Sequence, residues 1–190
     1  MDSFKLIAIT PAEVFDGEVE AIIELLDNGY DRVHIRHPHY AKDAIRRLIS
    51  AIPAELHSRL SLHDCHELAI EFPSVGIHLN ARNPIAPANF RKILSMSCHA
   101  LDQIENARQQ ACDYCFLSPI YDSISKPGYL AKFRLTPELR TVISKMPTIA
   151  LGGVTPDKFD ELRQFGFAGA AMLGAAWNSK QYNKQLNWKH

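Results

Sequence analysis

The chain has 190 residues, of which 46% are hydrophobic and 22% charged, and its 21 lysines and arginines balance its 21 aspartates and glutamates. This length and composition indicate one soluble globular domain over residues 1–190, with a core over about 4–177 and a polar tail over 178–190. The absence of a basic excess argues against a nucleic-acid-binding protein, and no apolar run is long enough to cross a membrane. No secretory signal is recognisable, so we expect a cytoplasmic protein whose four cysteines are reduced.

Short apolar segments alternate with amphipathic ones along the chain. The expected strands are 5–9, 32–36, 59–63, 75–79, 94–98, 113–117, 147–151 and 168–173. The expected helices are 17–28, 41–51, 101–111, 136–145 and 156–165, with a last helix drawn from 175–190. Two of these helices begin with Thr-Pro, which is a capping residue followed by proline in the first turn. A strand followed by a helix, repeated about eight times, predicts a closed (β/α)₈ TIM barrel rather than an open five-stranded sheet.

The stretch RVHIRHPHY, residues 32–40, contains three histidines. The twofold period of a strand places His34 and Arg36 on one face, which points into the barrel. His37 and His39 follow in a loop, where we expect them at the surface. The spacing of the three does not match a known zinc site.

The carboxyl ends of the strands carry the reactive groups of such barrels. The polar side chains expected there are His34 and Arg36 after the second strand, His63 and Asp64 after the third, His78 on the fourth, and Ser97 and His99 after the fifth.

A phosphate site is also expected at this end of the barrel. Bare amides after the seventh and eighth strands would face an anion near a helix start, and the loop after the sixth strand adds hydroxyls and an ammonium group. The residues are Gly152, Gly153, Leu173, Gly174, Ser123, Ser125 and Lys126. The competing interpretation is that the glycines only permit tight turns. Cys112 and Cys115, the one C-x-x-C pair, are interpreted as structural thiols.

These motifs resemble those of the thiamine phosphate synthase and TenI-like superfamily over nearly the full length of the chain. Ser97-Cys98-His99 matches a Ser-x-His motif, and Ser123-x-Ser125-Lys126-Pro127 falls where the synthases carry Thr-x-Thr-Lys-Pro. The segments IALGGVTPD (149–157) and GFAGAAMLGAAW (166–177) match the motifs of the last two strands, and Asp64 matches a metal-binding aspartate.

The resemblance implies a TIM-barrel enzyme of thiamine biosynthesis, a transferase that joins hydroxymethylpyrimidine diphosphate to thiazole phosphate and releases pyrophosphate. It implies small phosphorylated substrates, a possible homodimer, and Mg²⁺ held by Asp64. The candidate catalytic residues are then His34, Arg36, His63, Ser97, His99 and Lys126.

The chain departs from the synthase pattern at several positions. His34 replaces a glutamine, Pro38 a lysine and His63 an asparagine, while Asn83 stands where a second metal carboxylate is usual. One carboxylate gives a weaker Mg²⁺ site than two. An alternative is a TenI-like thiazole tautomerase, since histidine suits proton transfer near pH 7. Pro119, however, is shared with the synthases. A non-catalytic barrel that binds a phosphorylated ligand is the third possibility.

Overall fold

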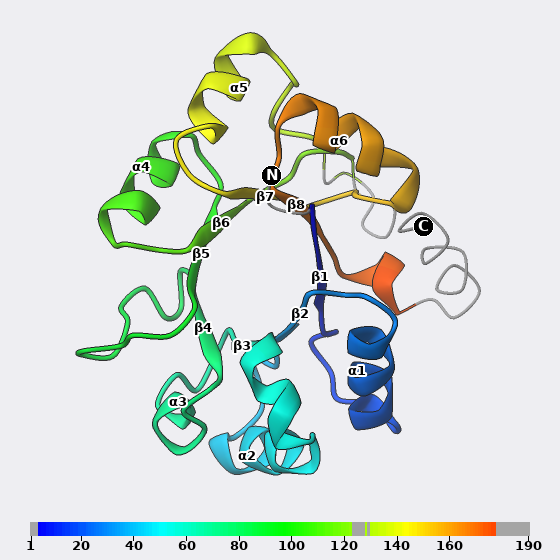
Figure 1. Cartoon of the computed structure of the whole chain (residues 1–190), viewed down its shortest axis with the longest axis vertical. Coiled ribbons are helices and arrows are strands. Elements are labelled where there is room, and N and C mark those ends of the chain that lie inside the picture. The colour runs from blue at the N-terminus through cyan, green and yellow to red at the C-terminus, as the bar shows by residue number, and fades with distance from the viewer. Residues whose placement is uncertain (1–3, 123–127, 129, 178–190) are drawn as a thin grey trace.

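The computed structural model describes residues 4–122, 128 and 130–177. Its eight strands are all parallel and pair in chain order to form a closed barrel, which a ring of helices surrounds (Figure 1). The strands are β1 Lys5–Ile9, β2 Arg32–Ile35, β3 Leu60–Leu62, β4 Gly76–Leu79, β5 Leu94–Cys98, β6 Tyr114–Leu117, β7 Thr148–Ala150 and β8 Gly169–Met172. The predicted TIM barrel is therefore confirmed, and each expected strand is found within one or two residues of its predicted ends.

The barrel closes where β1 pairs with β8, from Lys5 opposite Gly169 to Ala8 opposite Met172. A Cβ atom at Gly169 would lie 2.3 Å from the carbonyl oxygen of Lys5, so only glycine permits this approach. Beyond β8, the indole Nε1 of Trp177 donates a hydrogen bond of 2.7 Å to the carbonyl of Ile9. The first and last strands are thus joined along their length and at the carboxyl end.

The α-helices are α1 Glu18–Asp27, α2 Lys42–Ala51, α3 Leu68–Glu71, α4 Asp102–Gln109, α5 Pro137–Ile143 and α6 Phe159–Phe165. Short 3₁₀ helices span Ala54–Arg59, Pro156–Lys158 and Gly174–Ala176. Helix α1 buries Ile22, Leu25 and Leu26 against the barrel. Helix α5 begins after Thr136, whose hydroxyl accepts from the amide of Leu139, as the Thr-Pro pattern predicts.

One expected helix differs in form. The expected helix 156–165 is divided into a 3₁₀ turn and α6. A loop, residues 80–93, joins β4 to β5, where no helix was expected. Of the last helix expected from 175–190, the described part of the chain contains only the turn Gly174–Ala176.

The barrel interior is apolar on one side and polar on the other. Ile7, Ile9, Phe116, Ile149 and Ala171, from β1 and β6–β8, form an apolar cluster of their own. The facing strands β2–β5 contribute histidine and serine instead. No helix among the described residues is long and apolar enough to cross a membrane.

Candidate active site

Three histidines lie together inside the barrel, on its polar side. His34 lies on β2, His63 directly after β3, and His78 on β4, and one ring nitrogen of each lies within 4.8 Å of the others. Nδ1 of His34 is 2.9 Å from Nε2 of His63. His34 and His78 are fully buried, while His63 is 5% exposed. His63 is therefore the member of this cluster, the histidine layer, that a ligand can reach first.

Hydrogen bonds account for most of the ring nitrogens in the histidine layer. Nε2 of His34 is 2.7 Å from the hydroxyl of Tyr114. Both nitrogens of His78 lie 2.8 Å from serine hydroxyls, those of Ser95 and Ser97. The rings of His63 and His78 stack, with centroids 4.1 Å apart and planes at 19°, so their in-plane lone pairs lie in separate, nearly parallel planes. This geometry is that of a hydrogen-bonded layer and not of three ligands that converge on one metal.

Burial keeps the histidine layer uncharged. It lowers the pKa of His34 and of His63 well below the ordinary value, and the neighbouring His78 lowers both further. Burial also lowers the pKa of His78 to about 3. Neutral imidazole can accept a proton, but the lowered pKa makes His63 a weaker base than a free histidine.

The expected surface position of His37 is wrong. Its side chain is buried, and Nε2 lies 2.9 Å from Oε1 of the equally buried Glu18 at the start of α1. Nδ1 lies 3.2 Å from the carbonyl oxygen of Ala12, to which it donates. His37 therefore joins the connection after β2 to the one after β1 and plays a structural part, whereas His39 is exposed as expected.

Asp64, the expected Mg²⁺ ligand, is already paired with a cation. Its Oδ1 accepts from Nε and Nη2 of Arg82, at 3.1 and 3.0 Å, and from Nδ2 of Asn83 at 3.0 Å. Oδ2 accepts from Nη2 of Arg82 at 3.3 Å. Mg²⁺ requires oxygen ligands with free lone pairs, and here an amide and a guanidinium already bind the Asp64 carboxylate. These residues as they stand do not fit a magnesium site.

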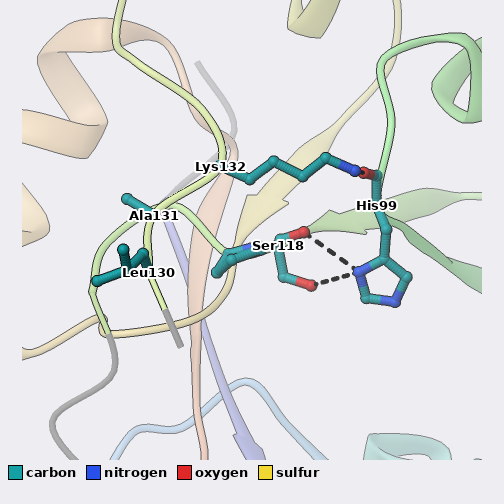
Figure 2. Close-up of a pocket in the computed structure, with 6 residues that line it drawn as sticks. His99, Ser118, Leu130, Ala131 and Lys132 are labelled. Atoms are coloured by element: carbon teal, nitrogen blue, oxygen red, sulfur yellow. Dashed lines mark hydrogen bonds between the residues drawn. The ribbon is translucent and has the colours of Figure 1, made fainter. Parts of the chain in front are cut away.

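A cavity of about 410 Å³ opens at the carboxyl ends of β5 and β6 (Figure 2). Its lining residues are His99, Ser118, Pro119, Leu130, Ala131 and Lys132. Nδ1 of His99 lies 3.1 Å from Oγ of Ser118 and 3.2 Å from its carbonyl oxygen. The ammonium group of Lys132 donates to the carbonyl of His99, as Figure 2 shows. The cavity thus combines an imidazole, a hydroxyl and an ammonium group, a set that suits an anionic ligand.

The glycines after β7 lie against the loop after β6. Gly152 and Gly153 have φ values of 90° and 62°. A Cβ atom at Gly153 would lie 2.3 Å from the carbonyl oxygen of Asp122, and one at Gly152 would lie 2.8 Å from Cα of Pro119. This close approach of two loops supports the interpretation of the glycines as turn residues. It also places the amides of β7's loop beside the cavity wall formed by Pro119.

The remaining expected phosphate contacts have different outcomes. Gly174 faces open space at the start of a three-residue turn, and Leu173 is 40% exposed. Ser123, Ser125 and Lys126 lie outside the described residues, so their role stays a prediction. The structure separates the other candidates into two groups: His34, His63 and Ser97 belong to the histidine layer, and His99 belongs to the cavity.

Three residues of the site escaped the sequence interpretation. Tyr114 holds His34, Arg82 holds Asp64, and Lys132 lines the cavity. Tyr114 could have been found, because its position two residues before Phe116 on the same strand gives it the same inward face. Arg82 and Lys132 lie in loops, and nothing in the local sequence shows which side chain a loop turns toward the barrel.

Comparisons with known proteins agree on one family. A family model described as "Thiamine monophosphate synthase" matches residues 6–176. A curated thiamine-phosphate synthase of Prochlorococcus marinus is 28% identical over 135 residues, 67% of this chain and 38% of that protein. One of Lactococcus lactis subsp. cremoris is 25% identical over 190 residues, 92% of this chain and 87% of that protein.

A solved structure shares the whole barrel. The crystal structure of a thiamine phosphate pyrophosphorylase from Bacteroides thetaiotaomicron is 34% identical, with a TM-score of 0.80 over 97% of this chain and 93% of that one. The chain matches less than half the length of the first three curated relatives. The matched region spans 38%, 36% and 41% of their lengths.

Proposed function

Because the chain belongs to the thiamine monophosphate synthase family, we propose that it is a transferase of thiamine biosynthesis. It joins hydroxymethylpyrimidine diphosphate to thiazole phosphate, and thiamine phosphate and pyrophosphate are the products. The observation that carries this proposal is the match of a complete barrel, at 34% identity, to a solved thiamine phosphate pyrophosphorylase.

The cavity carries side chains that suit the phosphate and diphosphate groups of the proposed substrates. In the proposed reaction the diphosphate departs from the pyrimidine, which becomes a cation. The thiazole nitrogen then bonds to that cation. Lys132 and His99 bind a phosphate group, because an ammonium and an imidazole can donate hydrogen bonds to its oxygens. Arg36 adds positive charge at the end of β2, where no carboxylate within the described ranges forms an ion pair with it.

The test is to incubate the protein with both phosphorylated substrates and to measure thiamine phosphate and pyrophosphate, with a known synthase as the positive control. We expect both products in equal amounts. Lys132→Ala should lower kcat/KM by roughly tenfold or more, since a charge-assisted contact to phosphate is lost. Lys145→Ala, an exposed lysine beyond α5, is the matched control and should leave the rate unchanged. If no product forms where the known synthase is active, the transferase proposal is wrong.

The histidine layer favours a second candidate, an isomerase that moves a proton on a thiazole carboxylate phosphate. The nearly buried His63, hydrogen-bonded to His34 and through it to Tyr114, is a neutral base held in a fixed orientation. Exchange of the substrate proton in D₂O, followed by NMR, would test this function. Loss of proton exchange in the His63→Ala variant supports the isomerase. An exchange rate that neither His63→Ala nor His34→Ala changes excludes these two histidines as the base.

A further inference from the structure

The loop that joins β4 to β5 is organised around one asparagine. Oδ1 of Asn80 accepts from the backbone amides of Arg82 and Asn83, at 2.9 and 3.2 Å. Its Nδ2 donates to the carbonyl of His63 at 2.7 Å. Asn80 therefore shapes its own loop and fixes that loop to the end of β3, where Asp64 follows.

This arrangement delivers Arg82 to Asp64 in a defined geometry. Three contacts join the guanidinium to the carboxylate, and Asn83 adds a fourth through Nδ2 while it also donates to the carbonyl of His63 at 3.0 Å. Asp64 is largely buried, with its side chain 14% exposed, whereas Arg82 is 46% exposed. A guanidinium has five N–H donors in one plane, so Arg82 keeps donors that face solvent after its contacts with Asp64.

The same point of the barrel mouth is positively charged. Arg36 directly follows Ile35, whose carbonyl accepts from the amide of His63 at 3.0 Å, and Arg82 is paired with Asp64, which follows His63. Asp64 pairs with Arg82, and Arg36 has no carboxylate partner among the residues that the structure describes, so one positive charge remains in excess.

We propose that the guanidinium of Arg82 takes the place of a divalent cation at Asp64, and that the protein binds the phosphate groups of its ligand through Arg82 and Arg36 without a metal. Arginine suits this role because it binds a carboxylate on one edge and phosphate oxygens on another. The proposal rests on the proposed function only for the phosphorylated nature of the ligand. The exclusion of the metal follows from the contacts of Asp64 alone.

The first test measures metal binding without any substrate. Mn²⁺, a paramagnetic substitute for Mg²⁺, is titrated into the purified protein, and free Mn²⁺ is followed by electron paramagnetic resonance. We expect the wild type to have no Mn²⁺ site that depends on Asp64, so the substitution Asp64→Asn should not change Mn²⁺ binding. The double variant Arg82→Ala, Asn83→Asp should gain one site, because it frees Asp64 and adds a second carboxylate.

Arg46→Ala is the matched control. It also frees two carboxylates, but these are exposed ones, Asp43 on α2 and Glu71 at the end of α3, and it should gain no comparable site. Circular dichroism and thermal melting verify that each variant is folded. A wild-type Mn²⁺ site that Asp64→Asn abolishes overturns the proposal, and so does a folded double variant that binds no more Mn²⁺ than the wild type.

The second test uses inorganic pyrophosphate as the probe in isothermal titration calorimetry. The wild type should bind equally well in EDTA and in excess Mg²⁺, and Arg82→Ala should weaken binding roughly tenfold or more. Arg46→Ala should bind like the wild type. Binding that appears only with Mg²⁺, or that Arg82→Ala leaves unchanged, contradicts the proposal. Because neither test depends on turnover, a failed synthase assay would refute the function and leave this inference standing.

Discussion

Glu18 and His37 form an ion pair that is almost completely enclosed, with side chains 2% and 0% exposed. Both ring nitrogens of His37 face oxygens, Nε2 that of Glu18 at 2.9 Å and Nδ1 the carbonyl oxygen of Ala12 at 3.2 Å. Removing one partner of such a buried pair lowers the free energy of unfolding strongly, because the other group stays buried without its partner.

We therefore expect Glu18→Ala to destabilise the protein by about 3–5 kcal/mol, as measured from urea unfolding at pH 7. Glu105→Ala removes an exposed ion pair with Arg108 and serves as the control, for which the change should be much smaller. Equal losses in the two variants would show that the Glu18 pair contributes no more than a surface contact.

Single residues also show where prediction from sequence ends. The inward direction of His34 follows from the alternation along β2, and the structure confirms it. The burial of His37 does not follow from its neighbours, because its partner Glu18 comes from another connection of the barrel. The pairing of Asp64 with Arg82 is of the same kind, since it depends on how a loop folds back.

At the scale of elements, the carboxyl-end loops support one another. The loop after β7 lies so close to the loop after β6 that its two glycines have no room for a side chain. Backbone hydrogen bonds join the same loops, from Ile120 to Leu151 at 2.9 Å and from Tyr121 to Gly152 at 3.0 Å. The wall of the cavity at Pro119 is thus held by its neighbour along the barrel.

Gly153→Ala should displace the loop after β6, because the new Cβ atom would overlap the backbone of residues 121 and 122. We expect a loss of about 2 kcal/mol or more in the free energy of unfolding, including the strain of a positive φ. We also expect weaker binding of pyrophosphate by calorimetry. Gly174→Ala, where the Cβ atom meets nothing within 4 Å, is the control and should be nearly neutral. An unperturbed Gly153→Ala variant would mean that the two loops are not coupled.

For these elements the sequence predicts order and type better than length. All eight strands follow from short apolar runs between amphipathic segments. No helix was expected over residues 80–93, but the shape of this loop could not be predicted from its pattern. Its structure depends on Asn80, whose side chain replaces backbone hydrogen bonds that a helix would make.

For the whole molecule, the histidine layer links stability to pH. The pKa of His34 lies well below its value in the unfolded chain, and that of His78 is about 3, both because of burial. Between these folded values and the ordinary value near 6.5, the unfolded chain binds more protons than the folded one. Stability should therefore be complete above about pH 6.5 and should decline as the pH falls toward about 3.

Each such histidine should reduce the free energy of unfolding by about 1.4 kcal/mol per pH unit within this window. Urea unfolding at pH 7.5, 6 and 5 measures the slope. His78→Asn, which keeps a polar group without a charge change in this range, should make the slope shallower even if it lowers stability at pH 7.5. A wild-type free energy that is constant from pH 7.5 to 5 would contradict the assignment of a neutral layer.

The junction of β1 with β8 has a consequence for biosynthesis of the molecule. The strand that completes the ring is the last to leave the ribosome, and its partner is the first. Until residue 172 emerges, β1 offers an unpaired edge to any other chain nearby. We expect ribosome-bound chains whose β8 is still inside the exit tunnel to be held by chaperones and open to protease, and chains whose β8 has emerged to become resistant in a single step.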